Sequence, residues 1–246
     1  MKRLSYETLR EQGYDGFLLQ DAPERFLQFG EGNFLRAFAD YFVDVMNEKC
    51  GFASKVVIVQ PTGRNMRPHD SLNKQEGLYT LLSRGKAGGR KVEEARVISS
   101  VSRCLNPVSE YDSYMACALN PALRFIISNT TEAGIRYDPA CLFTDRPASS
   151  FPGKLTQFLY ARYREFGQER GKGLVLLPCE LIEDNGKALK ESILQYVVQW
   201  ELEEGFVKWL EEENLFCSTL VDRIVTGYPK GELSALQERF GYEDDL

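Results

Sequence analysis

A glycine-rich turn stands where a short apolar run gives way to a helical pattern, and its spacing suits the binding of a diphosphate. The run ERFLQF leads directly into GEGNF at residues 30–34. Glycine allows a tight turn and lets an anion approach the backbone, and the free amides at the start of a helix then face that anion. We expect four residues to form a pyrophosphate turn: Gly30, Gly32, Asn33 and Phe34.

The match to the full G-x-G-x-x-G fingerprint is incomplete, because Leu35 stands where the third glycine would be. A bare G-x-G also occurs in tight strand–helix connections that bind no ligand, so both interpretations stay open. The residue that holds the adenosine ribose is usually acidic and follows the second strand. Gln60 takes that place here, with Arg64 close behind. Since Gln60 can bond a hydroxyl and Arg64 can meet a 2′-phosphate, these residues leave NAD and NADP both open.

Short apolar runs alternate with longer amphipathic stretches, which is the pattern of βα units around a largely parallel sheet. The expected strands are residues 24–29, 55–60, 96–102, 124–128 and 173–178. The expected helices are residues 33–49, 154–165 and 186–213, the last broken near Gly205, with Asp40 and Asp44 off the apolar stripe of the first. Residues 84–91 are basic and glycine-rich and predict a mobile hairpin or loop. The predicted fold class is α/β, a Rossmann-like, doubly wound, mostly parallel sheet flanked by helices.

Composition narrows the class of protein. The 246 residues carry a net charge of −6, which argues against a general nucleic-acid binder, because such a protein needs a basic face to release phosphate counterions. The six cysteines form no C-x-x-C pair and His69 is the single histidine, so no metal site is expected. No apolar run is long enough to cross a bilayer. We expect a cytoplasmic protein with free thiols and no membrane partner.

Four segments, in order, resemble the mannitol dehydrogenase family of long-chain polyol dehydrogenases. QFGEGNFLRAF at residues 28–38 resembles the N-terminal signature of that family, and LFCSTLVDRIVTG at 215–227 resembles its second signature. ISNTTEAGI at 127–135 and LPCELIEDNG at 177–186 fall between them in the expected order. The stretches QFGEGNFLRAF, QEGLYTLLSR and PCELIEDNG are more similar to the tagaturonate reductase (altronate oxidoreductase) branch than to the mannitol branch.

The resemblance implies hydride transfer, without a metal, between NAD(H) and a keto sugar acid such as tagaturonate. It implies that residues 1–246 form an NAD(P)-binding Rossmann-like domain, whose last fifteen or so residues are a candidate linker to a mainly helical C-terminal domain. The catalytic lysine of the family lies near the start of that second domain, and no segment here matches its motif. We expect this chain to bind cofactor but to turn over poorly or not at all. Fructuronate reductase and mannitol dehydrogenase are sibling alternatives, and a non-catalytic NAD-binding module is an alternative of another class.

Polar residues follow the expected strand at 124–128, where the carboxyl edge of a doubly wound sheet lines the nicotinamide crevice. The three candidates for cofactor contact there are Asn129, Thr130 and Thr131. Thr131 before Glu132 is also good helix-capping chemistry, which remains an alternative. Gln60 is expected near the adenosine ribose.

The remaining roles come from the resemblance. Asn185 matches the asparagine that donates to the substrate oxygen on which negative charge builds, although Asn185-Gly186 is also a simple turn signal. Asp222 is expected at the substrate cleft, and either Arg223 or a residue of the C-terminal domain can hold the carboxylate of a sugar acid. A structural Asp–Arg ion pair is the alternative for both. Cys179 stands in a motif, but no histidine lies nearby to activate it, so a structural thiol is expected.

Overall fold

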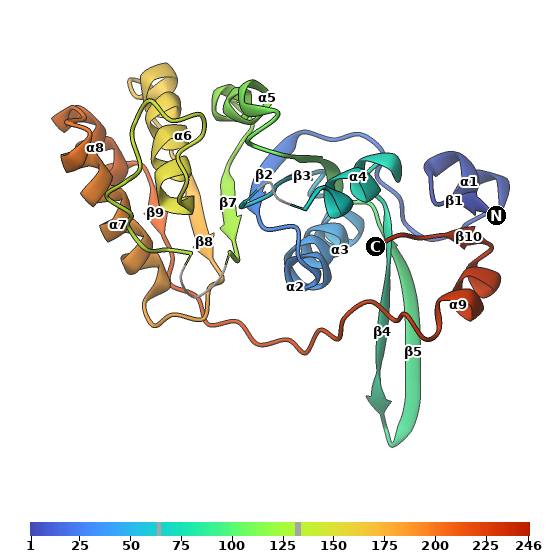
Figure 1. Ribbon diagram of the computed structural model, residues 1–246. Coiled ribbons are helices and arrows are strands. Elements are labelled where there is room, and N and C mark those ends of the chain that lie inside the picture. The colour runs from blue at the N-terminus through green and yellow to red at the C-terminus, as the bar shows by residue number, and fades with distance from the viewer. Residues whose placement is uncertain (63–64, 131–133) are drawn as a thin grey trace.

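The computed structural model describes residues 1–62, 65–130 and 134–246. Its centre is a sheet with the strand order β6-β3-β2-β7-β8-β9, in which every neighbouring pair is parallel (Figure 1). The strands are β2 (Glu24–Phe29), β3 (Lys55–Val59), β6 (Val101–Leu105), β7 (Phe125–Ser128), β8 (Val175–Pro178) and β9 (Leu215–Phe216). Because the order reverses between β2 and β7, the switch point lies at the carboxyl ends of these two strands. The predicted fold class is confirmed.

Helices cover both faces of this sheet. One face carries the continuous run of α2 (Asn33–Leu35), the π-helix η1 (Arg36–Asp40) and α3 (Tyr41–Cys50), and then α4 (Met66–Lys74). The other face carries α5 (Tyr111–Ala116), the 3-10 helix η2 (Cys117–Leu119), α6 (Phe151–Phe166), α7 (Asn185–Gln199) and α8 (Glu204–Glu212). Within the described residues, no helix is long and apolar enough to cross a bilayer.

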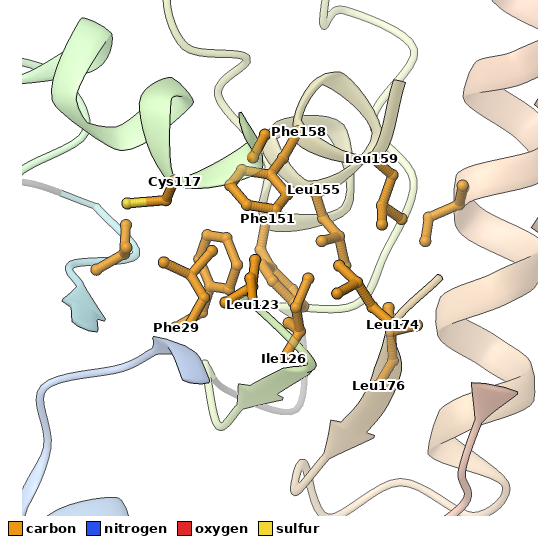
Figure 2. Packing of buried hydrophobic residues seen from close by; sticks show 14 of the residues in the cluster. Phe29, Cys117, Leu123, Ile126, Phe151, Leu155, Phe158, Leu159, Leu174 and Leu176 are labelled. Atoms are coloured by element: carbon orange, nitrogen blue, oxygen red, sulfur yellow. The ribbon is translucent and has the colours of Figure 1, made fainter. Parts of the chain in front are cut away.

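The sheet supplies side chains to two separate cores. Leu27 and Phe29 of β2 belong to the core under α5 to α8, whereas Phe26 belongs to the core under α2 to α4. Successive side chains of a strand point to opposite faces, so a strand buried on both faces reads as a continuous apolar run. Figure 2 shows Phe29 beside Phe151 of α6, whose ring centroids are 4.9 Å apart.

A long hairpin projects from the body of the molecule (Figure 1). It consists of β4 (Tyr79–Ala87) and β5 (Arg90–Ile98), which pair antiparallel from end to end. Near its base lie the N-terminal β1 (Lys2–Arg3) and α1 (Tyr6–Glu11), and the C-terminal α9 (Leu233–Phe240) and β10 (Tyr242–Glu243). Strand β1 pairs in parallel with β10, and a small third core joins these pieces to the hairpin.

Most of the predicted elements lie within two residues of an observed one. The run at 96–102 was wrong as a single strand, because Ser99 and Ser100 separate the end of β5 from β6. The break near Gly205 was also misplaced, since α7 ends at Gln199 and Gly205 lies inside α8. A Cβ at position 205 would come within 2.4 Å of the Tyr163 hydroxyl, so this glycine permits close packing rather than a break.

The aspartates off the apolar stripe of the first helix are fully buried. Asp44 accepts a hydrogen bond from the Ser99 N–H at 2.8 Å and forms an ion pair with Arg96 at 2.6 Å. Both partners belong to β5 or the residues after it, which cover this side of the helix. The helix is therefore enclosed by the sheet on one side and by the hairpin on the other.

The last fifteen residues are docked on the domain, and their role as a linker to a further domain stays a prediction. Asp244 accepts hydrogen bonds from the Gln75 amide at 2.9 Å and from the Thr80 N–H at 2.6 Å. The Asp245 N–H donates to the Gln75 side-chain oxygen at 2.8 Å. With α9 and the β1–β10 pair, these bonds make the tail part of the folded unit.

Candidate functional site

The glycine turn is fixed between the ends of two strands. The Gly30 N–H donates to Val59 O of β3 at 3.1 Å, and the Asn129 N–H donates to Phe29 O at 3.0 Å. Gly30 has φ +127°, and a Cβ there would come within 3.0 Å of Asn129 O. Glycine is required at this position because only it adopts such a φ readily and leaves room for the neighbouring carbonyl.

The second glycine of the turn faces open space. Gly32 is the N-cap of the helix at residues 33–50, it makes no side-chain cap, and a Cβ added there meets no atom within 4 Å. The first amides of a helix lack intrahelical acceptors and attract anions. An open cradle above uncapped amides, at the switch point of the sheet, fits the diphosphate of a dinucleotide. The backbones of Asn33 and Phe34 continue this cradle, and their contact with a diphosphate stays a prediction.

A π-helical turn follows the cradle, and side chains from elsewhere satisfy its backbone. The Tyr79 hydroxyl donates to Arg36 O at 2.7 Å, and the Ser100 hydroxyl donates to Asp40 O at 2.8 Å. The Arg36 side chain turns back to the cradle, donating to Glu31 O at 3.1 Å and to the Asn33 side-chain oxygen at 2.5 Å. Single π turns inside α-helices often occur at functional sites.

A buried polar chain connects the cradle to this π turn. The Gln28 amide donates to Gly30 O at 3.0 Å and to Asp40 Oδ2 at 3.4 Å, and Tyr79 approaches the same carboxyl at 3.5 Å. Burial raises the pKa of Asp40 to about 7. Asp40 Oδ1 and Gln28 Oε1 are buried without a hydrogen-bond partner in the described part of the chain.

Gln60 lies at the end of β3, beside the glycine turn, as predicted. Its side chain is 1% exposed, and its amide donates to Asn65 O at 2.6 Å and to the Glu31 carboxylate at 3.3 Å. Its Oε1 atom has no partner among the described residues. Arg64, the predicted partner for a 2′-phosphate, lies outside the residues that the structure describes.

The polar residues after β7 bond to the loop that follows β8. Both the N–H and the hydroxyl of Thr130 donate to Glu180 at 3.0 Å, and the Ser128 hydroxyl donates to the other oxygen of the same carboxylate at 3.0 Å. The Asn129 amide donates to Cys179 O at 2.6 Å. These bonds hold two neighbouring strand ends together beside the cradle. Thr131 lies outside the described residues.

Asn185 begins α7 and is fully buried. Its amide lies within 3.0 to 3.3 Å of four protein oxygens, those of Pro178 O, Glu180 O and both Thr219 O and Oγ1. Its Oδ1 accepts the Thr219 N–H at 2.9 Å. In this arrangement the side chain positions the segment after β9 and has no free N–H, because its two hydrogens already face protein acceptors. Its role as a donor to substrate stays a prediction.

Asp222 and Arg223 lie in an extended segment that crosses the molecule between β9 and α9 (Figure 1). Arg223 stacks over the ring of Tyr41 of α3 at 5.0 Å. Asp222 is exposed, and no ion pair joins it to Arg223 in the described part of the chain. The geometry therefore does not support a structural ion pair between Asp222 and Arg223. Their substrate roles stay predictions.

Several residues of the site were not predicted. Glu180 follows β8 and could have been found from the rule that carboxyl ends of parallel strands share one edge. Gln28 could have been noticed as a polar residue inside an apolar strand. The burial of Cys179 raises the pKa of its thiol to about 11, which agrees with the structural role expected for it.

A doubly wound parallel sheet with a glycine turn at its switch point defines a Rossmann-type domain. Residues 24–246 match the family described as mannitol dehydrogenase Rossmann domain, and the chain belongs to this family.

Curated relatives agree over nearly the whole chain. Altronate oxidoreductases of Shigella flexneri and of Yersinia enterocolitica are each 48% identical over 241 residues, which are 98% of this chain and 49% of those proteins. Altronate oxidoreductase of Escherichia coli O7:K1 is 48% identical over 239 residues, which are 97% of this chain and 48% of that protein. The chain spans about half the length of these relatives.

Solved structures share the fold at lower sequence identity. Mannitol 2-dehydrogenase of Pseudomonas fluorescens, in a ternary complex with NAD and D-mannitol, superposes with a TM-score of 0.78 at 20% identity over 98% of this chain and 51% of that one. A D-sorbitol dehydrogenase in substrate-free form superposes with a TM-score of 0.81 at 20% identity over 99% of this chain and 52% of that one. Both neighbours support the fold and are longer chains.

Proposed function

We propose that this chain is the NAD-binding domain of an oxidoreductase that transfers hydride between NAD(H) and a keto sugar acid of the tagaturonate or altronate kind. The open cradle at Gly32, at the switch point of a Rossmann-type sheet, is the observation that carries the proposal. Relatives named altronate oxidoreductase support the substrate class, and a neighbour solved with NAD supports the cofactor. Fructuronate reductase and mannitol dehydrogenase remain sibling alternatives.

The proposed cofactor runs across the carboxyl edge of the sheet. Its diphosphate lies over Gly30, Gly32 and the amides that follow, while its adenosine ribose lies beside Gln60. Its nicotinamide end lies over Asn129 and Thr130, in the crevice between the ends of β7 and β8, with Thr131 expected there. When bound, NAD(H) supplies or accepts the hydride. The protein holds the diphosphate with backbone amides and thereby fixes where the nicotinamide lies along the carboxyl edge of the sheet.

Substrate contacts are proposed for the segment that Asn185 holds in place. The exposed carboxylate of Asp222 can accept hydrogen bonds from a polyhydroxylated substrate, and the guanidinium of Arg223 can pair with its carboxylate. Asn185 is proposed to stabilise the developing alkoxide of the substrate. To do so, its amide must give up one of its hydrogen bonds to a protein oxygen and donate to the substrate oxygen instead. The hydrogen bonds that Asn185 makes in this structure support a role in positioning Asp222 and Arg223.

A second domain is proposed to complete the active site. The relatives are about twice as long as this chain, and the segment carrying Asp222 exposes Leu220 and Ile224 by 96% and 92%. Large apolar side chains exposed together on one extended segment are typical of surfaces that meet another protein surface. We propose that the further half of the longer relatives packs here and supplies the catalytic base, as the family resemblance implies.

Titration of NADH by fluorescence tests the proposal. The G32V variant fills the open cradle without meeting a protein atom, so it should melt normally but bind NADH at least about tenfold more weakly, a difference of roughly 1.4 kcal/mol. Gly85 is a matched control, because a Cβ there also meets nothing and it lies in the hairpin, away from the cradle. Equal NADH affinity for G32V and G85V would contradict the proposed site.

Addition of tagaturonate then separates an enzyme from a binding module. The chain should consume NADH slowly or not at all by absorbance, because the proposed base lies elsewhere. Rates like those of a full-length relative would refute that part of the proposal. NADH binding without consumption, even after the second half of a longer relative is joined to the chain, would favour a non-catalytic module.

A further inference from the structure

The adenosine end of the proposed site has an acidic group in an unusual place. The usual carboxylate after the second strand is replaced by Gln60. A carboxylate is nevertheless present, because Glu31, the middle residue of the glycine turn, lies 3.3 Å from the Gln60 amide. The charge comes from the turn itself rather than from the end of β3.

Backbone bonds fix Glu31 at this junction. Strands β2 and β3 pair in register up to Phe29 and Val59, and the Gly30 N–H donates to Val59 O at 3.1 Å. Glu31 O accepts from the Arg36 side chain at 3.1 Å. Glu31 is thus the second residue after β2 and Gln60 the first after β3, and the paired strand ends bring the two residues close together.

One acceptor at this point, Gln60 Oε1, has no donor among the described residues. The Gln60 amide donates to Asn65 O and to the Glu31 carboxylate, whereas Gln60 Oε1 is buried without a partner in the described residues. A buried acceptor without a donor carries a desolvation cost. The vicinal hydroxyls of an adenosine ribose supply two donors, one for Gln60 Oε1 and one for the Glu31 carboxylate.

Among the described residues, which do not include Arg64, the surrounding charge also disfavours a phosphate. Burial raises the pKa of the nearby Cys104 thiol, and the charges of Glu31 and Glu110 raise it further. Arg36 opposes them, but its guanidinium is already bonded to Glu31 O and to the Asn33 side chain. A 2′-phosphate would bring about two negative charges to a carboxylate and would leave only the 3′-hydroxyl of the ribose as a donor.

We propose that Glu31, positioned by Gln60, makes this site select NAD over NADP by accepting a ribose hydroxyl and repelling a 2′-phosphate. This inference rests on the proposed function. It assigns cofactor selectivity to a residue inside the glycine turn. It predicts that loss of the Glu31 charge changes the affinity for NADPH far more than the affinity for NADH.

Paired fluorescence titrations of the 246-residue chain with NADH and NADPH test the proposal. Unsubstituted protein should bind NADPH at least about thirtyfold more weakly than NADH. The E31Q variant keeps the shape and removes the charge, so NADPH should tighten about tenfold while NADH changes less than about threefold. Glu212→Gln makes the same charge change at an exposed site on α8 and should leave the ratio of the two dissociation constants unaltered.

The outcomes separate the two proposals. If NADH binds and E31Q leaves the ratio unchanged, Glu31 does not select the cofactor, although the site itself stands. Equal binding of both cofactors by the unsubstituted chain also overturns the inference. If neither cofactor binds, the proposed function fails together with it. E31A provides a second variant without the charge, and thermal melting of each variant verifies that it is folded.

Discussion

Asn185 and Thr219 are bonded to each other in both directions. The Thr219 N–H donates to Asn185 Oδ1 at 2.9 Å, and the Asn185 amide donates back to Thr219 O at 3.1 Å. A Cβ at Gly186 would come within 2.4 Å of Cys217 O, so the same junction also requires glycine. Through this contact, α7 holds the start of the segment that carries Asp222.

We predict that N185A loosens this segment. The substitution removes the partner of the Thr219 N–H and of Thr219 O in a partly buried place, which should cost about 2–4 kcal/mol of unfolding free energy. Hydrogen exchange should increase first in residues 217–229. T219S keeps the hydroxyl and the backbone bonds and should stay within about 1 kcal/mol. Unchanged exchange of this segment in N185A would contradict the positioning role.

Gly30 offers a test of backbone strain at the turn. G30A should destabilise the fold by about 1–3 kcal/mol, because an alanine at φ +127° is strained and its Cβ would press on Asn129 O. Chemical denaturation measures the loss. Gly85→Ala has open space at its Cβ and should stay close to the unsubstituted protein. A stable G30A protein would mean that the turn relaxes easily.

The buried carboxyl of Asp40 predicts a pH dependence of stability. Burial raises its pKa in the folded state to about 7, above the unfolded value of about 3.9, so the folded state holds the proton more strongly. Stability should therefore fall as pH rises from about 4 to about 7, by on the order of 3 kcal/mol, and then level off. Denaturant titrations across this range measure the slope.

The D40N variant should flatten that slope and be more stable at pH 8 than the unsubstituted protein. Its amide stays neutral at every pH and can donate to the unpartnered Gln28 Oε1. D44N makes the same substitution one turn later, but it removes the buried one of the two carboxylates that pair with Arg96 and should destabilise the protein. A D40N protein that keeps the full pH slope would assign the slope to another group.

Arg162 stabilises the core on the α6 side. Its fully buried side chain donates to four backbone carbonyls within 2.8 to 3.1 Å: Lys172, Ala118, Asn120 and Leu123. R162M removes all the donors and leaves these carbonyls unsatisfied, so it should cost about 3–5 kcal/mol, measured by denaturant unfolding.

Arg164, two residues along the same helix, is the control for this prediction. Its side chain is exposed and pairs with Glu203 at 3.3 Å. R164M should change stability by no more than about 0.5 kcal/mol. Equal losses for R162M and R164M would show that the buried bonds contribute little.

The parts that could be predicted from the sequence are those with local causes. Strand β2 and the turn after it follow from an apolar run that ends at Gly30 and Gly32. Contacts that join distant residues could not be predicted. Tyr79 reaches Asp40 across 39 positions, through a hairpin whose placement depends on the whole fold. Asn185 was recognised, but its burial depends on Thr219 and could not be read from an Asn-Gly pair.

The pairing of β1 with β10 has a consequence for the order of folding. Lys2 lies opposite Tyr242. The two residues lie about 240 positions apart in the sequence, so Leu4 cannot pack against Tyr242 in their shared core until residue 242 has been made. The parallel sheet can assemble without that contact. The base of the hairpin is therefore expected to close last in a newly made molecule.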